Sequence, residues 1–456
     1  MIYMLYEECG VFGISCNNNA AFNSILGLHA LQHRGQESFG VVTGYNDKLH
    51  SYHFPGQVSS ILDDIDKIKE SLPGSYAIGH VRYSTSGSKA GTQPMLGSSK
   101  FGSFAVAHNG NLIKTAELRE QLLSRGCVFK TDIDTEIVLH LVATSTERSF
   151  LESFIGALKQ IQGAYSLVAI HEDTIFGVRD PAGIRPLVLG QLNNSYVLAS
   201  ETCALDIVNA SFIREIKPGE LVTIDPNGTL TSTFPFSPQK SSFCVFEYIY
   251  FSRPDSRMED KSIYEVRKDI GRTLAEESPS DNADVVVPIP DSGIPAAIGY
   301  AERSGLPMEL GIIRNHYIGR TFIQPTAEVR KVRVKLKYNA NKYILKNKSI
   351  VLIDDSIVRG STLKNIIFIL KDAGVKEIHL KISSPPIKYP CFYGIDTPDS
   401  KDLIAANLSV EEMRDSIGVD SLAFLSINGL YHAIKAESTE PQYCDACFTG
   451  YYPIGK

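Results

Sequence analysis

The sequence lacks any run of about 18 or more apolar residues, so no transmembrane helix is expected. Its first ten residues, MIYMLYEECG, lack the basic region and the long apolar stretch of a secretory signal. Basic residues are not in excess either, since 45 Lys and Arg stand against 51 Asp and Glu. This balance argues against a general nucleic-acid-binding protein, because phosphate binding needs a basic face. We therefore expect a cytoplasmic protein that binds neither membranes nor nucleic acid.

Internal repeats of fixed period and low-complexity tracts are also absent from the 456 residues. This length exceeds what one hydrophobic core usually serves, so two or three domains are expected. The eight cysteines do not imply disulfides in a reducing cytoplasm, which makes catalysis or metal binding the hypothesis to test for some of them. We interpret Cys16, Cys127 and Cys203 as small buried hydrophobic side chains.

The part of the chain up to about residue 238 is rich in short β-type runs separated by turn residues, a pattern typical of antiparallel sheets. The runs are GVFGIS, FGVVTGY, YAIGHVRYS, FGSFAVAHNG, AYSLVAIHE, TIFGVRD, LVLGQL, SYVLAS and ELVTIDP. Two helix-like stretches, AAFNSILGLHALQHR and DTEIVLHLVATS, have apolar spacing near 3.6. The mixture predicts an α+β layered domain, and the Pro- and Ser-rich segment 231–242 is interpreted as a linker.

Beyond this segment the pattern changes to strand, loop, helix and strand, which predicts a parallel α/β sheet. ADVVVPIP is followed by the helix-like PAAIGYAERSG, and KSIVLIDDSIVRG leads into STLKNIIFILKDAG and EIHLKISSPP.

The string VLIDDSIVRGSTL, residues 351–363, is the most informative part of this second half. Asp354 and Asp355 stand at the carboxyl end of a buried strand, where ligands bind in open α/β sheets. Gly360 lets the backbone approach a ligand closely, and the next two residues open a helix whose free N–H groups can hold a phosphate. No GxxxxGK[ST] P-loop is present. The alternative is a capped helix that follows a strand with two solvated acids.

This string resembles the signature of type I phosphoribosyltransferases, which bind phosphoribosyl pyrophosphate. The resemblance implies that the paired acids contact the ribose hydroxyls or a metal ion, and that the following turn binds the 5′-phosphate. The candidate substrate contacts here are Asp354, Asp355, Ser356, Arg359, Gly360, Ser361 and Thr362.

A second loop, PIPDSGIPAAIGYA at 288–301, has the same strand–turn–helix form. The resemblance places it on the pyrophosphate side, with Ser292 near a magnesium ion. Ser292, Asp354 and Asp355 are therefore candidate Mg²⁺ contacts, direct or through water. The alternative for Ser292 is a simple helix N-cap.

Between these loops lies a basic segment, with eight Lys or Arg and no acid from 330 to 348. A solvated basic face is the usual meaning of such a run. Beside a polyanionic substrate it would instead act as a closing lid. Arg320, Gln324 and Lys335 fall in a segment that resembles the family's flexible loop over the substrate.

Five pieces of the first half belong together. Cys9 lies in EECGVFGI, HRGQESFG at 33–40 forms a turn after a helix, and GHVRYSTSG puts Arg82 at the end of a strand. AHNGN at 107–111 is expected to put Asn109 and Gly110 in a turn, and TDIDTE follows with Asp134. Together they resemble class II glutamine amidotransferases, whose N-terminal-nucleophile fold is a four-layer αββα sandwich.

The resemblance implies an amide-hydrolysing site. A thiol is intrinsically nucleophilic, and removal of residues 1–8 as a propeptide would give Cys9 an α-amine, with a pKa of roughly 7.7–8, to act as the base. The Asn109 side chain and the Gly110 N–H would form the oxyanion hole. Arg82 would pair with the α-carboxylate of glutamine and Asp134 with its α-ammonium, the alternative for both being a surface ion pair.

Four other cysteines resemble the ligands of an iron–sulfur-containing subgroup of the amidophosphoribosyltransferase family. Cys444 and Cys447 form C-x-x-C, which alone fits zinc, redox chemistry or nothing. With Cys244 and Cys391 they would bind a 4Fe-4S cluster, although four cysteines would also accept zinc. The spacing suggests a structural staple.

The resemblance to amidophosphoribosyltransferases covers nearly the whole chain. It implies an N-terminal-nucleophile αββα sandwich at 9–238, followed by an α/β type I phosphoribosyltransferase domain at 239–456. The implied reaction moves the amide nitrogen of glutamine to phosphoribosyl pyrophosphate in purine synthesis, with purine-nucleotide feedback and a tetramer as further family expectations. The rivals are another enzyme with the same glutaminase half, a non-enzymatic phosphoribosyl pyrophosphate sensor, and a degenerate homologue with a dead cluster.

Overall fold

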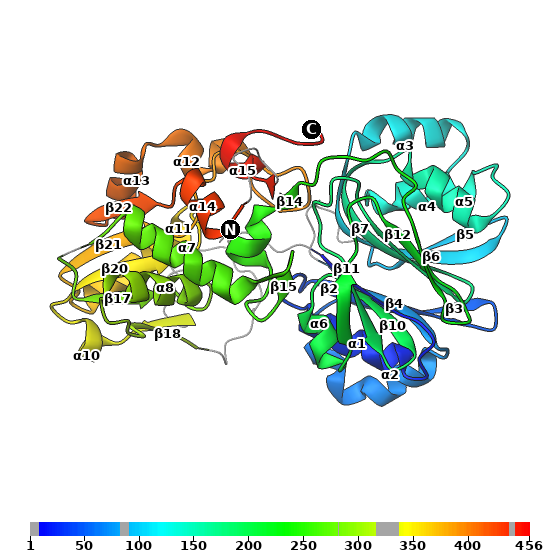
Figure 1. Ribbon diagram of the computed structural model, residues 1–456, viewed down its shortest axis with the longest axis horizontal. Coiled ribbons are helices and arrows are strands. Elements are labelled where there is room, and N and C mark those ends of the chain that lie inside the picture. The colour runs from blue at the N-terminus through cyan, green and yellow to red at the C-terminus, as the bar shows by residue number, and fades with distance from the viewer. Residues whose placement is uncertain (1–8, 83–90, 281, 316–336, 437–442) are drawn as a thin grey trace.

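The computed structural model describes residues 9–82, 91–280, 282–315, 337–436 and 443–456. They form two lobes, and the chain crosses from one to the other near residue 240 (Figure 1). The expected propeptide 1–8 and the lid residues Arg320, Gln324 and Lys335 lie outside the described residues.

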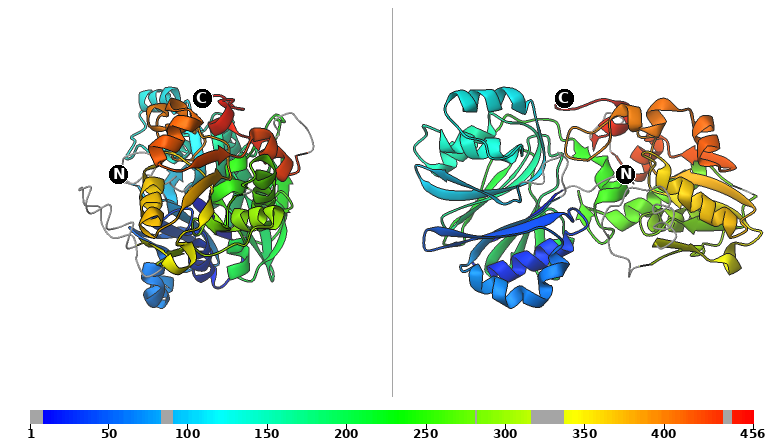
Figure 2. Two further views of the ribbon diagram at one scale, coloured as in Figure 1. Left: turned by 90° about the vertical axis from the view of Figure 1, so that its left-hand side faces the viewer. Right: turned by 180° about the vertical axis from the view of Figure 1, so that it is seen from behind.

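The first lobe contains two antiparallel sheets that pack face to face (Figures 1 and 2). The seven-stranded sheet has the order β11-β9-β10-β1-β4-β2-β3. Its strands are β1 Gly10–Ile14, β2 Ser38–Tyr45, β3 Lys48–Phe54, β4 Tyr76–Arg82, β9 Val188–Leu192, β10 Ser195–Ala199 and β11 Ser211–Glu215. The six-stranded sheet has the order β13-β12-β8-β7-β6-β5. Its strands are β5 Met95–Ser99, β6 Gly102–Ile113, β7 Gln162–His171, β8 Thr174–Arg179, β12 Leu221–Ile224 and β13 Leu230–Thr233.

Helices cover the outer face of each sheet, so the expected αββα sandwich is confirmed. The first sheet is covered by α1 Ala20–Ala30, α2 Ile65–Ser71 and α6 Cys203–Ile207, and the second by α3 Thr115–Ser124, α4 Thr135–Ala143 and α5 Phe150–Leu158. Val11 and Ile78 of one sheet meet Val168 and Ile175 of the other in a fully buried layer. Burial on both faces explains why these strands read as near-continuous apolar runs.

One expectation for this lobe was wrong, and another was right except at its first boundary. Asn109 and Gly110 do not lie in a turn but inside strand β6, where Gly110 is opposite Tyr165 of β7. The expected linker 231–242 starts later than predicted: residues 231–233 belong to β13, which pairs with β12 at the sheet edge, whereas 234–242 lie outside the strands and helices where the chain crosses to the second lobe. In both places ladder pairing with a neighbouring strand outweighed a local turn or loop signal.

The second lobe is built on a parallel sheet of order β17-β20-β21-β22, which confirms the α/β prediction. Its strands are β17 Val285–Pro288, β20 Ser349–Asp354, β21 Glu377–Ile382 and β22 Ser421–Phe424. Side chains alternate between its faces: Val286 and Val351 point to one hydrophobic cluster, and Val287 and Leu352 to another.

Helices pack on both faces of this parallel sheet. One face carries α7 Ile263–Glu277, α8 Ile294–Ser304 and α14 Ile427–Ala433, and the other α11 Ser361–Asp372 and α13 Val410–Ile417. Smaller elements are β15 Arg257–Met258, β16 Lys261–Ser262, β18 Ile312–Arg314, β19 Tyr338–Ala340, α10 Lys342–Leu345, α12 Ile404–Asn407 and the short 3-10 helices Val58–Asp64 and Ser400–Asp402. Within the described residues, no helix is long and apolar enough to cross a membrane.

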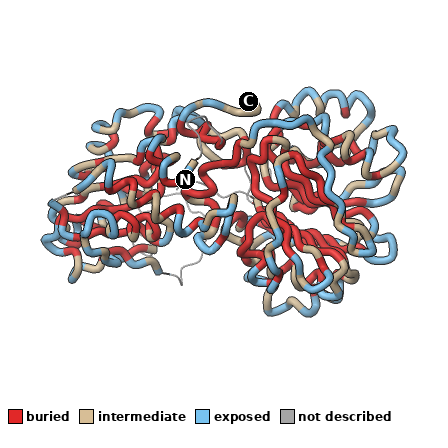
Figure 3. The backbone as a smooth tube through the Cα atoms, in the orientation of Figure 1, coloured by how far each residue is buried: buried red, intermediate tan, exposed pale blue. Residues whose placement is uncertain are grey.

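The junction between the lobes is buried as continuously as their centres (Figure 3). Here the two-residue strands β14 Phe243–Cys244 and β23 Tyr443–Cys444 pair in parallel, and a π-helix covers Glu247–Phe251. The C-terminal helix α15 Ala446–Thr449 follows β23 directly. The C-terminal end of the chain is therefore fastened to the segment that leaves the first lobe.

Lys381 of β21 is an unusual charge beneath the second lobe's helices. It is 4% exposed, its Nζ donates to the Ser278 hydroxyl at 2.5 Å, and burial lowers its pKa to about 8. An ammonium in this position costs free energy at neutral pH, because desolvation disfavours the charged form.

We expect Lys381→Met to raise the free energy of unfolding at pH 7 by about 1–2 kcal/mol. Between about pH 8 and 10.5 the unfolded Lys381 of the parent holds a proton that the folded one has lost, so parental stability rises with pH. The variant should lack this rise in urea unfolding followed by circular dichroism. The exposed Lys376→Met is the matched control. Identical pH profiles for parent and Lys381→Met would contradict the account.

Candidate active sites and the junction between them

Cys9 is held at the start of β1 by a buried arginine. The Nε of Arg34, which follows α1, donates to the Cys9 carbonyl at 3.2 Å, and the Arg34 side chain is fully buried. Gly10 is opposite Val81 of β4, so Cys9 stands beside the end of β4, where Arg82 lies. The turn expected after the first helix therefore supplies an anchor for the cysteine backbone.

Asn109 and Gly110 reach the same place from the second sheet. The Ser200 hydroxyl lies 2.9 Å from the Val11 nitrogen and 3.5 Å from Nδ2 of Asn109. Ser200 thus links β1 to β6 at Val11, two residues after Cys9. Gly110 has φ of +142°, and a Cβ there would lie 2.0 Å from the Ala164 carbonyl oxygen. Only glycine fits, and this distortion inside a strand is typical of functional positions.

Arg82 and Asp134 are not the surface ion pair that was the alternative interpretation. Arg82 is 7% exposed and its Nη1 donates to the Gly91 carbonyl. Asp134 is the N-cap of α4 and accepts from the Leu112 N–H at 2.8 Å. Burial raises the pKa of Asp134, but the nearby His108 and these hydrogen bonds outweigh it and lower the pKa overall, so the carboxylate stays ionised.

The second candidate site is a cleft at the carboxyl end of β17 and β20. The residues expected there from sequence line it together: Ser292, Asp354, Asp355, Ser356, Arg359, Gly360, Ser361 and Thr362. Gly360 has φ of +72° and precedes α11, which begins at Ser361 as expected. The N-terminus of this 12-residue helix faces the cleft, a common position for a bound phosphate.

The two acids of the cleft repel each other. Burial raises the pKa of both Asp354 and Asp355, and the charge of Asp355 raises that of Asp354 further. Hydrogen bonds from Ser292 and Ser356 partly offset this at Asp355, with the Ser356 hydroxyl 2.6 Å away. Ser292 lies in the turn before Gly293, the true N-cap of α8, so it is not the helix cap. The arrangement favours a bound cation.

A buried ion network at the junction was not indicated by the sequence. Arg34 donates to Glu201 at 2.5 Å and to Glu247 at 2.6 Å, and Arg185 donates to Glu247 at 3.3 Å. All four side chains are fully buried. Glu247 belongs to the second half of the chain, 213 residues from Arg34. The segments around Arg185 and Glu201 carried no assigned role, because a single sequence does not reveal which distant charges pair.

The network continues toward the second cleft. The Ser252 hydroxyl donates to Glu247 at 2.6 Å, and the Ser252 carbonyl accepts from Nη2 of Arg267 at 2.7 Å. Arg267 is 4% exposed, and its charge acts on Asp355. A chain of hydrogen-bonded and charged groups therefore connects the Cys9 carbonyl with Asp355 in the acidic pair of the other lobe.

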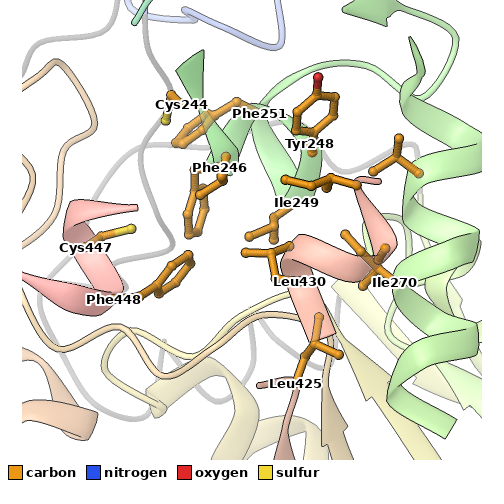
Figure 4. Close-up of a cluster of buried hydrophobic side chains, with 14 of the residues drawn as sticks. Cys244, Phe246, Tyr248, Ile249, Phe251, Ile270, Leu425, Leu430, Cys447 and Phe448 are labelled. Carbon is orange, nitrogen blue, oxygen red and sulfur yellow. The ribbon is translucent and has the colours of Figure 1, made fainter. Parts of the chain in front are cut away.

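The four cysteines expected to act together do gather at the junction. Cys244 is directly opposite Cys444 in the β14–β23 pair, and Cys391 and Cys447 lie near enough for their charges to act on Cys444 or on each other. Figure 4 shows Cys244 and Cys447 beside Phe246 and Phe448. Burial and the neighbouring thiols raise the pKa of Cys444 to about 12. Within the described ranges, no three His, Cys, Asp or Glu side chains are arranged to hold a single metal ion.

The three remaining cysteines do not all fit the interpretation as buried hydrophobic side chains. Cys203 is 3% exposed, as expected. Cys16 and Cys127 are only half-buried, because they lie where strands and helices meet loops at the edge of the first lobe.

Two known families match separate parts of the chain, and known proteins match nearly all of it. A family described as a glutamine amidotransferase domain matches residues 80–206, and one described as a phosphoribosyl transferase domain matches 261–383. An amidophosphoribosyltransferase of Rhizobium etli is 48% identical over 98% of this chain and 92% of its own. One of Bacillus subtilis is 45% identical over 98% and 94%.

Solved structures agree with these relatives. A glutamine phosphoribosylpyrophosphate amidotransferase from B. subtilis, complexed with ADP and GMP, superposes with a TM-score of 0.91 at 44% identity. It covers 98% of this chain and 97% of that one. A second structure, described as the allosteric regulatory enzyme of purine biosynthesis, has a TM-score of 0.92, also at 44% identity, over 98% of this chain and 96% of its own.

We expect Glu247→Gln to lower the free energy of unfolding by about 3–5 kcal/mol, since it removes the buried carboxylate that Arg34 and Arg185 share and leaves Arg34 only Glu201. Urea unfolding at pH 7 measures the change. Glu302→Gln is the matched control, because Glu302 is 42% exposed in its ion pairs with Lys268 and Arg272 and should cost less than about 1 kcal/mol. Equal decreases in the free energy of unfolding of the two variants would show that the buried network contributes no more to stability than an exposed ion pair.

Proposed function

This chain belongs to the amidophosphoribosyltransferase family, and from that membership we propose how its two sites divide the reaction. The enzyme transfers the amide nitrogen of glutamine to phosphoribosyl pyrophosphate in purine biosynthesis. The products are 5-phosphoribosylamine, glutamate and pyrophosphate. The proposal for individual residues rests on one observation: the strand start at Cys9 meets Asn109 through Ser200, while the acidic cleft lies in the other lobe.

Cys9 is the proposed nucleophile of the first lobe. Its sulfur attacks the side-chain carbonyl carbon of glutamine, a thioester forms, and ammonia leaves with the proton that the base removed. Water then attacks the thioester, which releases glutamate and restores the thiol. The α-amine of Cys9 serves as the base once residues 1–8 are removed, because its usual pKa is near 7.7–8.

Asn109 and Gly110 are the proposed oxyanion donors. The Asn109 oxygen Oδ1 is buried, and among described groups it has no hydrogen-bond donor when Nδ2 faces Ser200. Exchanging the amide oxygen and nitrogen lets the Ser200 hydroxyl donate to Oδ1, because that hydroxyl already accepts from Val11 N–H. Nδ2 is then available to the oxyanion.

Arg82 and Asp134 are the proposed contacts of the amino-acid end of glutamine. Arg82 offers a planar fork of donors to the α-carboxylate. Asp134 stays ionised and would accept from the α-ammonium, supported by its lowered pKa. A glutamine held by its α-carboxylate and its α-ammonium would extend its side-chain amide toward Cys9.

The acidic cleft is the proposed phosphoribosyl pyrophosphate site. Ser361 and Thr362 at the N-terminus of α11 would bind the 5′-phosphate, and Asp354 and Asp355, which line the same cleft, would contact the ribose and hold a Mg²⁺ ion. The raised pKa of both acids supports a cation there, and Mg²⁺ supplies charge neutralisation to the pyrophosphate. Ammonia bonds to C1 as the C1–oxygen bond breaks, and the electron pair leaves with pyrophosphate. Arg320, Gln324 and Lys335 are proposed lid contacts.

Cys244, Cys391, Cys444 and Cys447 are proposed to hold a 4Fe-4S cluster. Two supports are the Cys244–Cys444 register and the mutual repulsion of buried thiols, which bound iron would relieve. The cluster would act as a structural staple between the segment that leaves the first lobe and the C-terminal end.

Three further proposals concern the enzyme's setting. Purine nucleotides are proposed feedback inhibitors, supported by the ADP and GMP bound to the B. subtilis structure. A homo-tetramer is proposed from the family alone. The cytoplasmic location expected from the sequence stays a proposal.

We expect Cys9→Ala to lower glutamine-dependent pyrophosphate release more than about 10³-fold, because the nucleophile is gone. Release with ammonium chloride as the nitrogen donor should stay within about twofold of the parent. Asp355→Asn should abolish pyrophosphate release with either nitrogen donor, while Cys9 should still be able to react. The intact mass of the active enzyme should equal that of a chain that begins at Cys9. Full glutamine activity in Cys9→Ala, or with Met1 still attached, would contradict the mechanism.

Anaerobically purified protein should contain about four iron and four sulfide per chain, the stoichiometry of a 4Fe-4S cluster. Cys447→Ser should lose most of both and unfold more readily, since the staple is broken. Cys203→Ser is the matched control: Cys203 is a buried thiol in the core of the first lobe, and its replacement should leave the metal content unchanged. Stoichiometric zinc in place of iron would overturn the cluster proposal.

A further inference from the structure

Residues 392–394 of the second lobe lie directly against the strand that carries the proposed oxyanion donors. Asn111 Nδ2 of β6 donates to the Phe392 carbonyl at 2.9 Å, although these residues are 281 positions apart. The buried Arg185 of the first lobe donates through Nε to the Tyr393 carbonyl at 2.8 Å. Consecutive carbonyls of one segment are thus held by two side chains of the other lobe.

Gly394 completes this contact. A Cβ on Gly394 would lie 3.1 Å from both the Cα and the carbonyl carbon of Gly110, and the φ of Gly394 is +112°. Gly110 is confined on another side by the Ala164 carbonyl. The backbone of the proposed oxyanion glycine is therefore packed between its own sheet and the second lobe.

We propose that Asn111 is a positioning residue for the glutaminase reaction, and that it acts by fastening β6 to residues 392–394. Loss of its hydrogen bond would let β6 move at Gly110 by an amount that misdirects the oxyanion donors. Such sites tolerate little displacement, because donors act only when they lie close to the forming oxyanion. The inference rests on the proposed oxyanion role of Asn109 and Gly110.

The same segment begins at a proposed cluster ligand. The Tyr393 N–H donates to Cys391 Sγ at 3.3 Å, and the Cys391 N–H donates to the Thr397 hydroxyl at 2.5 Å. The conformation of 391–394 is thus set on one side by the cysteine site and on the other by Asn111 and Arg185. A displacement of Cys391 would therefore be transmitted to Gly110 through residues 392–394.

The test compares Asn111→Ala with parent enzyme in two measurements. Glutamate release with both substrates present should show a kcat about 10-fold lower and a KM for glutamine within about twofold, because Arg82 and Asp134 are untouched. The rate of Cys9 alkylation by iodoacetamide, read by peptide mass, should not change, because alkylation develops no oxyanion. Gly394→Ala approaches the same contact from the second lobe and should give the same pattern with the metal content of the parent.

Asn17→Ala is the matched control, since its side-chain amide bonds Ser195 inside the first lobe and should leave kcat unchanged. Asn109→Ala distinguishes a failure of the oxyanion assignment from a failure of the positioning role of Asn111. If Asn109→Ala lowers kcat and both Asn111→Ala and Gly394→Ala do not, the positioning role is wrong. If Asn109→Ala itself has no effect, the oxyanion assignment fails and the inference with it. Equal losses of kcat and alkylation rate in Asn111→Ala would reveal a general distortion and also overturn the proposal.

Discussion

The buried pairing of Arg34 with Glu201 and Glu247 is the interaction on which the arrangement of the two lobes depends. A buried charge without its partner is strongly destabilising, so the lobes can meet only where Glu247 reaches the guanidinium group. The same guanidinium donates to the Cys9 carbonyl. The position of Cys9, the proposed nucleophile, and the docking of the second lobe are thereby set by one side chain.

This constraint gives the junction a double role. It keeps a cysteine site of one lobe and an acidic phosphate cleft of the other in a fixed relation, which suits an enzyme that must deliver ammonia from one centre to the next. Asn111, Arg185 and Gly110 add a second line of contact through residues 392–394. Both lines use polar groups with defined directions, which apolar packing alone would not provide.

Much of the fold follows from local patterns in the sequence, and the exceptions have identifiable causes. The buried strands β1, β7 and β20 are continuous apolar runs and were predicted. The strands β3, β5, β11 and β13 were not, because their side chains are largely exposed or interrupted by a bulge. Asn109–Gly110 looks like a turn, yet the long β6–β7 ladder holds it extended. The clustering of cleft residues was predictable from one short string, whereas the Arg34–Glu247 pair joins positions too distant for any local signal.

The central claim is that the two sites work as one enzyme, and it is tested most directly by following glutamate and pyrophosphate in one sample. Glutamine and Mg²⁺ are supplied with and without phosphoribosyl pyrophosphate. The account predicts that both products rise together in equal amounts, and that glutamate release is slow when the sugar donor is omitted. Glutamate formed at the same rate with no pyrophosphate would contradict it, and would mean that the second lobe only senses its ligand or serves another acceptor.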